Sequence, residues 1–318
     1  PSARRAAACA SPECPDEING RIRVPQRGPP QADLRLRGLR ASANQLYLVT
    51  SASVTLALEH IRRMRGGAQS HLMRCADGHY YVVKFQNNPQ HRRVLVNELL
   101  ATRVAARLGL PTPQVAVIEV RKDLIDLTTE LAIQFGTGRV PCRHGFQFGS
   151  RYPGDPARTP VHDFLPDEHL REVENLVDFA GMLVFDKWTC NTNGRQAIFF
   201  TEPGRSGFTA WMIDLGFCFN AGEWSFPDAP LRGLYARQRV YDSVRSLQSF
   251  GPWLDRLEKI DWSSVFDELQ KEIPPEWYED DQDALFRLLD KLLARRRIVP
   301  ELILEAKKTY RQPFSNWM

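Results

Sequence analysis

Acidic and amide side chains gather in one short stretch in the middle of the chain. Residues 185–200 place Asp186, Asn191, Asn193 and Gln196 between two apolar segments. A carboxylate can accept a proton from a nucleophile, and carboxylate and amide oxygens are ligands for Mg²⁺. Asp186 and Asn191 have the D-x4-N spacing of loops that carry a catalytic base and a metal-binding amide. The alternative is structural, because Asp and Asn also cap helix ends and stabilise turns.

A second candidate metal ligand follows a short apolar run. Residues 197–200 and 211–213 are both typical of strands, and the second run ends in Asp214, followed by Leu215 and Gly216. An acid at a strand end followed by Gly suits a metal-bound phosphate. A structural turn explains this tripeptide equally well. The order and separation of the two loops are more specific than either loop alone.

The first half of the chain contains a candidate phosphate-binding pair. Lys84 lies in the β-prone run Tyr-Tyr-Val-Val-Lys-Phe, and an unpaired buried ammonium group is very costly. Glu98, near the start of the next helical pattern, is the natural partner. The alternative is a solvent-facing Lys on an edge strand. Upstream, Gly66 and Gly67 allow backbone N–H groups to approach phosphate oxygens, although a plain turn is the simpler interpretation.

The elements that position these residues follow from hydrophobic periodicity. The sequence predicts a strand near Leu46 and Leu48, a short helix over residues 53–64, and a hairpin around Asp77-Gly78. A strong helix is expected from about Gln90 to Leu108. Strands over 115–120 and 130–135 complete a small sheet with one helix.

The second half is predicted to be mostly helical. Residues 136–166 are expected to be loop-rich, and one helix is expected from Asp167 to the central stretch, with Leu170, Val173, Val177, Ala180 and Val184 on one face. A long loop is expected after Gly216. Further helical patterns occupy about 237–250, 252–271, 281–297 and 299–310.

Composition and charge narrow the class of protein. The 318 residues carry a formal charge of +4, and residues 1–40 alone contain eight Arg and four acidic residues. The rest is neutral overall, so we expect no direct nucleic-acid binding by the core. The six Cys residues form no CxxC pair, which argues against a zinc site and favours a reducing cytoplasm. No apolar stretch is long enough to predict a membrane span.

In this order, the segments resemble the HipA-like kinase family, which is related to the phosphatidylinositol-kinase-like branch of the protein-kinase fold. Residues 67–69 (Gly-Ala-Gln) resemble its phosphate loop, and residues 83–85 (Val-Lys-Phe) its ATP-binding lysine strand. Residues 97–113 resemble its helix with the paired Glu and the turn that follows. Residues 131–135 resemble the hinge strand that contacts adenine, and residues 213–216 the metal-binding Asp segment.

Three departures from the family pattern concern catalysis. The family usually has asparagine-threonine-aspartate where residues 191–193 read Asn-Thr-Asn, so Asn193 stands where the resemblance implies the catalytic aspartate. The metal-binding asparagine is expected at Ile198, and Gln196 can replace it only in a shorter loop. Residues 61–66 contain no hydroxyl side chain, so the family's autophosphorylation switch is absent.

The resemblance implies an α+β, two-lobed protein-kinase-like fold. We expect a disordered basic tail over residues 1–42, a small β-rich lobe over 43–135 and a helical lobe over 136–318. The resemblance assigns nucleotide contacts to these residues: Gly66, Gly67, Gln69, Lys84, Glu98 and the hinge backbone of Gln134. It assigns Mg²⁺ to Asp214 and Gln196. The candidate catalytic residues are Asn193, Asp186 and Asn191, with Asp186 favoured as a structural anchor inside a helix.

The resemblance implies an ATP-dependent phosphotransferase with Mg²⁺ as cofactor, acting on Ser or Thr of an unknown protein substrate, at full or at weakened activity. A nucleotide-binding pseudokinase that acts as a binding or regulatory module is the alternative from another class. A third is a toxin–antitoxin-type protein whose main partner is a small DNA-binding protein. Residues 191–193 do not decide between activity and binding alone, because an Asn can orient a hydroxyl but cannot accept its proton.

Overall fold

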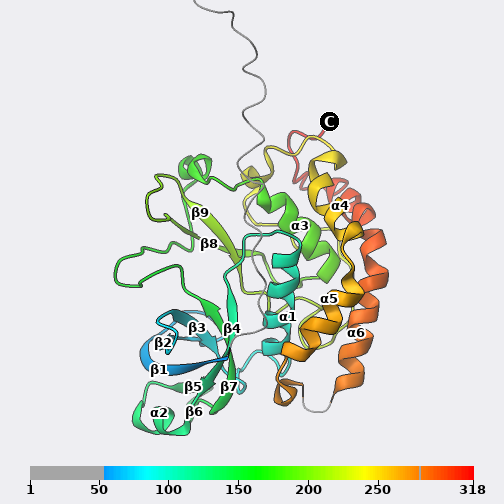
Figure 1. Ribbon diagram of the computed structural model, residues 1–318. Helices are drawn as coiled ribbons and strands as arrows, with labels where there is room; N and C mark the ends of the chain where they lie inside the picture. Colours follow the sequence, from blue (N-terminus) through cyan, green and yellow to red (C-terminus); the bar gives the residue numbers. More distant parts are fainter. Residues whose placement is uncertain (1–53, 279–280) are drawn as a thin grey trace, which may run out of the picture. The chain divides into compact units, whose positions relative to one another are not determined.

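Five strands form a small closed barrel in the first part of the chain (Figure 1). The computed structural model describes residues 54–278 and 281–318. The barrel strands are β1 (Val54–Arg63), β2 (His71–Cys75), β3 (Tyr80–Lys84), β4 (Val115–Val120) and β7 (Gly145–Arg151). Their order is β1-β2-β3-β7-β4, and β1 closes the barrel by pairing in parallel with β4. The predicted hairpin around Asp77 is confirmed, since β2 and β3 pair antiparallel.

The prediction of a helix over residues 53–64 is wrong, because residues 54–63 form strand β1. Residues near its start pair with β4, and residues from Ala57 onward pair with β2. Its Leu and Ile residues fit a helical spacing as well as a strand, and a short apolar run does not separate the two. Strands β2 and β4 provide hydrogen-bond partners on both sides, and this tertiary context favours a strand over a helix.

Two strands were missed in the segment expected to be loop-rich. Strand β6 (Gly138–Pro141) pairs with β5 (Ala132–Phe135) in a separate two-stranded sheet, and β7 lies between β3 and β4 in the barrel. Gly149 obscured β7, because Gly is unfavourable in strands. A Cβ atom at Gly149 would lie 2.4 Å from Ile118, so close packing explains this glycine. The barrel therefore extends past residue 135, and the exact division into lobes stays a prediction.

Helix α1 (Val94–Arg107) confirms the strongest helical pattern of the sequence and packs against β4 and β7. Gly109 follows it with φ +79°, and Pro111 prevents any continuation. Eleven of its 14 residues are buried, among them Asn97 and Glu98. A helix that is buried on nearly all sides belongs to a core, so its polar residues need internal partners.

Helix α3 (Asp178–Thr189) is the helix against which most others in the second part pack. It contacts α1, α4 (Gly251–Lys259), α6 (Gln282–Arg295) and α7 (Val299–Lys307), and Figure 1 shows it among them. Eleven of its 12 residues are buried. Fully burying one large side chain such as that of Trp188 contributes about 3 kcal/mol.

The single helix predicted from Asp167 is interrupted. A 3-10 helix covers Asp167–Glu172, the chain then forms a bridge between Val173 and Phe208, and α3 begins at Asp178. The side chain of Asn175 bonds both backbone groups of Ala210, which stabilises the non-helical segment. Local competition of this kind by an Asn side chain breaks helices.

The later strands and the last two helices lie where they were predicted, with different bounds. The pattern over 252–271 is divided into two helices and the one over 237–250 into two 3-10 helices, and the short helix at 122–127 was not predicted. Strands β8 (Gln196–Phe200) and β9 (Thr209–Ile213) form an antiparallel pair. Helix α5 (Trp262–Leu269) follows α4, and α2 (Lys122–Leu127) lies between β4 and β5. The 3-10 helices are Gln238–Tyr241, Leu247–Phe250, Gln270–Glu272, Pro275–Trp277 and Arg296–Ile298.

Two separate hydrophobic cores support the α+β, two-lobed organisation. One core lies within the strand-rich part and includes Val83, Phe85 and Ile118. The other joins α1 to the helical part and includes Leu99, Phe185 and Trp188. The predicted fold class is therefore confirmed: a β-rich part precedes a mostly helical part.

Some predictions concern residues outside the described ranges. The basic tail over 1–42 and the strand near Leu46 and Leu48 both lie there. Within residues 54–278 and 281–318, no helix is long and apolar enough to cross a membrane.

Candidate nucleotide-binding site

Lys84 joins three elements of the fold through its ammonium group. At the end of β3, its Nζ atom donates to Oε1 of Glu98 in α1 and lies 2.7 Å from Oδ1 of Asp214, the residue after β9. Lys84 is 7% exposed and Glu98 3%. The predicted pairing of Lys84 with Glu98 is thus present, and the structure adds Asp214 as a second carboxylate. Three residues predicted from separate motifs meet at one point.

The electrostatics of this triad keep Lys84 charged. Burial alone would lower the pKa of Lys84, but the carboxylates of Glu98 and Asp214 raise it above its usual value. Burial likewise works to raise the pKa of Asp214, and the Lys84 ammonium outweighs it and holds that pKa below its usual value. For Glu98, burial raises the pKa even beside Lys84. The Lys84 ammonium therefore favours the ionised form of Asp214.

Asp214 has a backbone conformation that fixes its direction. Its φ angle is +59°, in the left-handed region that non-glycine residues seldom adopt. The amide nitrogen of Gln196 donates to Oδ2 of Asp214. The two residues predicted to hold Mg²⁺ are therefore in contact. Mg²⁺ typically uses one or two carboxylates and completes its shell with phosphate and water, so Asp214 fits such an ion, and Gln196 would join it only by turning its amide oxygen toward the ion.

Asp186 lies inside α3 and is fully buried, as the anchor interpretation expects. Arg195 donates to both carboxylate oxygens, through Nε at 2.9 Å and through Nη2, and Asn191 Nδ2 donates to Oδ1 at 3.0 Å. The side chain of Arg195 is 1% exposed. Its Nη1 donates to the carbonyl oxygen of Ile213 at 2.9 Å. The Asp186 network therefore fixes the backbone directly before Asp214.

Asn193 is half-buried in the turn that follows α3. Its backbone N–H donates to Oδ1 of Asn191 at 3.1 Å, and its own Oδ1 accepts from the Gly194 N–H at 2.9 Å. Asn191 therefore connects the turn to Asp186. This arrangement places the three candidate catalytic residues in one hydrogen-bonded chain. Within it, Asp186 is enclosed and Asn193 lies toward the surface.

The glycine-containing loop is fastened in a way that the sequence did not predict. Gln69, with φ +49°, donates to the carbonyl oxygen of Gln134 at 2.8 Å and accepts from the Gln134 N–H at 2.7 Å. Asn88 donates to the carbonyl oxygen of Ala68. The backbone groups of Gln134 expected to face adenine are thus bonded to Gln69. Moreover, β5, which contains Gln134, pairs with β6 and is not a barrel strand.

Several polar residues that contact the segment after Asp214 were not singled out from the sequence. Asn97 is the main one, and the contacts of His91 and Arg93 accompany it. The only sequence signal was the position of Asn97 beside Glu98 in a largely apolar helix. Arg195 lies in the central stretch, and the sequence pattern assigned it no role.

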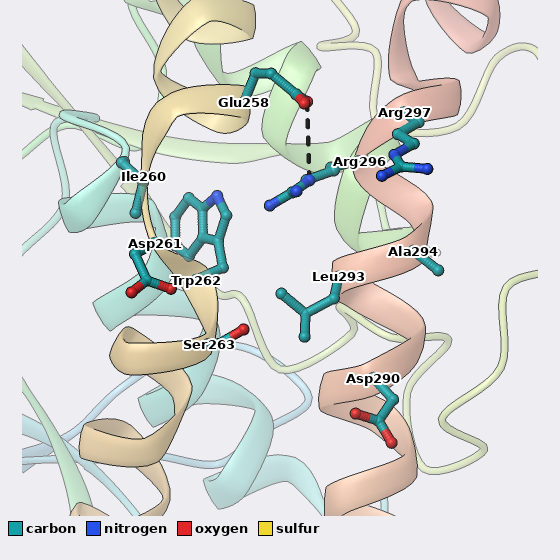
Figure 2. Close-up of a pocket in the computed structure, with 10 residues that line it drawn as sticks. All are labelled: Glu258, Ile260, Asp261, Trp262, Ser263, Asp290, Leu293, Ala294, Arg296 and Arg297. Carbon is teal, nitrogen blue, oxygen red and sulfur yellow. Dashed lines mark ion pairs between the residues drawn. The ribbon is translucent and has the colours of Figure 1, made fainter.

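A pocket of about 520 Å³ lies elsewhere, between the junction of α4 and α5 and helix α6 (Figure 2). Its lining includes an ion pair between Glu258 and Arg296, with N and O 3.8 Å apart. None of the predicted site residues lines it. In the described part of the chain, no cluster of three or more His, Cys, Asp or Glu residues is arranged to hold a metal ion. A metal at Asp214 would therefore depend on amide, phosphate and water oxygens.

Comparisons with solved structures give weak similarities to kinases. The Helicobacter pylori proinflammatory kinase CtkA has a TM-score of 0.47 at 12% identity, over 81% of this chain and 99% of that chain. A Golgi casein kinase has a TM-score of 0.45 at 12% identity, over 82% and 74%. Shewanella oneidensis HipA, in a complex with HipB and operator DNA, has 0.41 at 13%, over 79% and 68%. Likenesses of this strength carry no conclusion about activity or partner.

A family model matches part of the chain. No curated protein matches the chain. Residues 58–199 match the model of the HipA-like kinase family. The matched region includes the Lys84 strand, Glu98 and the whole turn from Asp186 to Gln196, and it ends before Asp214. This match confirms, over residues 58–199, the resemblance to the HipA-like kinase family drawn from the motifs.

Proposed function

We propose that this chain binds ATP with Mg²⁺ and transfers phosphate to a Ser or Thr hydroxyl of a protein at a reduced rate. The observation that carries the proposal is the meeting of Lys84, Glu98 and Asp214. A Lys on a strand, a Glu on the following helix and an Asp after a later strand are the parts that hold metal-bound ATP in kinases. The family match of residues 58–199 supports the same reaction class.

The residues have distinct roles in this proposal. Lys84 contacts the phosphates, and Glu98 orients Lys84. Asp214, with Gln196, holds Mg²⁺, which neutralises charge on the phosphates. Gly66 and Gly67 let the backbone approach the phosphate oxygens. Gln134 can bind adenine through its backbone only if Gln69 moves, since the two are bonded to each other.

The reduced rate follows from the absence of an available carboxylate in the turn. Asn193 cannot accept a proton, and both oxygens of the Asp186 carboxylate are bonded inside the protein. Loss of a general base typically lowers the rate by a factor on the order of 10²–10⁴. Phosphoryl transfer depends more on positioning and charge than on a base, so slow turnover is compatible with this site.

A pseudokinase that binds nucleotide without turnover is the second candidate. The missing carboxylate in the turn favours the pseudokinase, because Asn193 replaces the aspartate that the family resemblance expects. The two proposals differ in turnover and agree on binding.

Purified protein is incubated with Mg²⁺ and γ-labelled ATP, alone and with a mixture of generic protein acceptors. We expect slow labelling of protein that disappears in Lys84→Met and in Asp214→Ala. Nucleotide-dependent stabilisation without any labelling would select the pseudokinase. Absence of both labelling and stabilisation in wild-type protein would contradict both.

A further inference from the structure

Asn97 is the residue of α1 that makes the most polar contacts with the segment after Asp214. Its side chain is fully buried. The Nδ2 atom lies 2.8 Å from the carbonyl oxygen of Gly216, 3.0 Å from that of Cys218 and 2.7 Å from that of Ala221. Its Oδ1 accepts from the indole N–H of Trp224 at 2.8 Å. One amide thus fixes the backbone at three points and a side chain at a fourth.

Neighbouring residues of the α1 region strengthen the same contact. His91 Nε2 lies 2.9 Å from the carbonyl oxygen of Gly216, and Arg93 donates to that of Gly222 at 2.7 Å. The Arg93 guanidinium also lies 3.9 Å above the ring of Trp224. These contacts place residues 216–224 directly on α1. The segment is therefore held by polar bonds as well as by packing.

These contacts between the α1 region and residues 216–224 form a clamp. The clamp lies beside the triad of Lys84, Glu98 and Asp214. Along α1, Asn97 immediately precedes Glu98, which binds Lys84. In the clamped segment, Gly216 is two residues after Asp214, and the Leu215 N–H donates to Oε2 of Glu98 at 3.1 Å. A Cβ atom at Gly216 would lie 3.1 Å from Oε1 of Glu98, so the backbone at Gly216 lies close to the Glu98 side chain. A shift of the segment would therefore move Asp214 relative to Glu98.

We propose that Asn97 is a positioning residue that sets the place of Asp214 beside Glu98 and Lys84. This rests on the proposed function, since Asp214 is there the ligand of Mg²⁺. The chemistry requires an amide, because its two N–H donors lie among three carbonyl oxygens and its oxygen accepts from the Trp224 indole N–H. A carboxylate of the same shape would keep the acceptor and repel the three carbonyls. The triad is thereby held assembled before nucleotide binds.

A buried Asn that only stabilises the fold is the competing explanation. Its loss would lower the melting temperature without a selective effect on the metal. A positioning role predicts a selective effect, because the distance from Asp214 to the bound phosphates would change. The Mg²⁺ dependence of nucleotide binding therefore separates the two.

The test compares Asn97→Asp with Asn175→Asp in the full-length chain. Asn175 is the control, because its amide also bonds backbone groups, those of Ala210, and the side chain of Asp178, and it bonds none of the proposed site residues. Thermal shift is measured with ATP at fixed concentration and increasing magnesium chloride. Hydrogen exchange of residues 214–224 is measured on the protein without nucleotide.

We expect Asn97→Asp to raise the Mg²⁺ midpoint at least tenfold and to accelerate exchange over residues 214–224 at least tenfold. The control should leave both unchanged, even where its Tm falls. If Asn97→Asp does not fold, Trp224→Phe removes one bond of the clamp and should raise the midpoint and the exchange by a smaller factor. A folded Asn97→Asp protein with a wild-type Mg²⁺ midpoint would overturn the proposal.

The two measurements also separate this inference from the proposed function. If wild-type protein shows no nucleotide-dependent shift, the proposed function fails, and the assignment of Asn97 to a nucleotide site fails with it. Faster hydrogen exchange over residues 214–224 in Asn97→Asp would then show that Asn97 holds this segment in a protein that has no nucleotide site. Accelerated exchange together with a raised midpoint supports both.

Discussion

The ammonium nitrogen of Lys84 lies 2.7 Å from a carboxylate oxygen of Asp214, although 130 positions separate the two residues in the chain. Lys84 comes from the barrel, and Asp214 follows the β8–β9 pair. A buried pair of this kind costs desolvation energy, and it persists where geometry and further hydrogen bonds compensate. Glu98 and Gln196 provide those bonds. The contact is the physical centre of the proposed nucleotide site.

We predict that Asp186→Asn lowers stability much more than it lowers nucleotide binding. The substitution leaves the guanidinium of Arg195 buried without its counter-charge, and breaking such a pair costs about 3–5 kcal/mol. Chemical denaturation measures the free energy of unfolding, and thermal shift with Mg-ATP measures binding. A stable Asp186→Asn protein that has lost all turnover would instead identify Asp186 as the base.

Asn193→Asp is predicted to increase turnover. It restores a carboxylate at the half-buried position where the family resemblance expects the catalytic aspartate. Restoring a general base can raise the rate by a factor on the order of 10²–10⁴. Labelling with γ-labelled ATP measures the change, and Asn193→Ser serves as a control that adds no base. Equal turnover in wild-type, Asn193→Asp and Asn193→Ser proteins would contradict the assignment of Asn193.

Gly216→Ala is predicted to destabilise the protein and weaken nucleotide binding. Its Cβ atom would lie 2.8 Å from Val94 and 3.1 Å from Glu98. Overpacking of this kind costs about 1–3 kcal/mol. Gly251→Ala is the matched control, because no atom lies within 4 Å of a Cβ atom there. Urea denaturation should separate the two variants, and equal stability would show that the segment after Asp214 moves freely away from α1.

The pH dependence of stability should contain a contribution from Asp178. Burial raises the pKa of Asp178 to about 6, against the opposing effects of Asn175 and Arg256. A raised folded-state pKa means that the folded protein retains a proton that the unfolded chain has released. Stability from this group is therefore full below about pH 4 and is lost as pH rises to about 6, by up to about 3 kcal/mol.

Asp178→Asn removes this contribution. The difference in unfolding free energy between variant and wild type should favour the variant increasingly as pH rises from 4 to 6, and it should be constant above pH 7. Urea denaturation at a series of pH values measures it. A difference that does not change with pH would contradict the raised pKa.

The sequence predicted the triad better than the elements that surround it. Lys84 and Glu98 were paired because a Lys in a buried strand requires a carboxylate, and this requirement is local. Asp214 was identified separately, but its contact with Lys84 depends on how two distant parts pack. Asp186 was favoured as an anchor inside a helix, and the structure does place it in α3.

Other features depend on partners that a single sequence does not display. The apolar spacing of β1 also fits a helix, and only β2 and β4 beside it decide its conformation. Strand β7 was missed because Gly149 is required by close packing against Ile118. Asn97 received no role because a lone Asn in an apolar helix shows its function only when the carbonyl groups of residues 216–221 are placed around it.

Nucleotide binding tests the central claim most directly. The melting temperature of the wild-type protein and of Asp214→Ala is measured with ATP, with and without magnesium chloride, because a ligand that binds the folded state raises Tm by mass action. We predict a rise with Mg-ATP in wild-type protein that exceeds the rise with ATP alone, and loss of most of this Mg²⁺-dependent part in Asp214→Ala. No rise at millimolar Mg-ATP in folded wild-type protein would contradict the account.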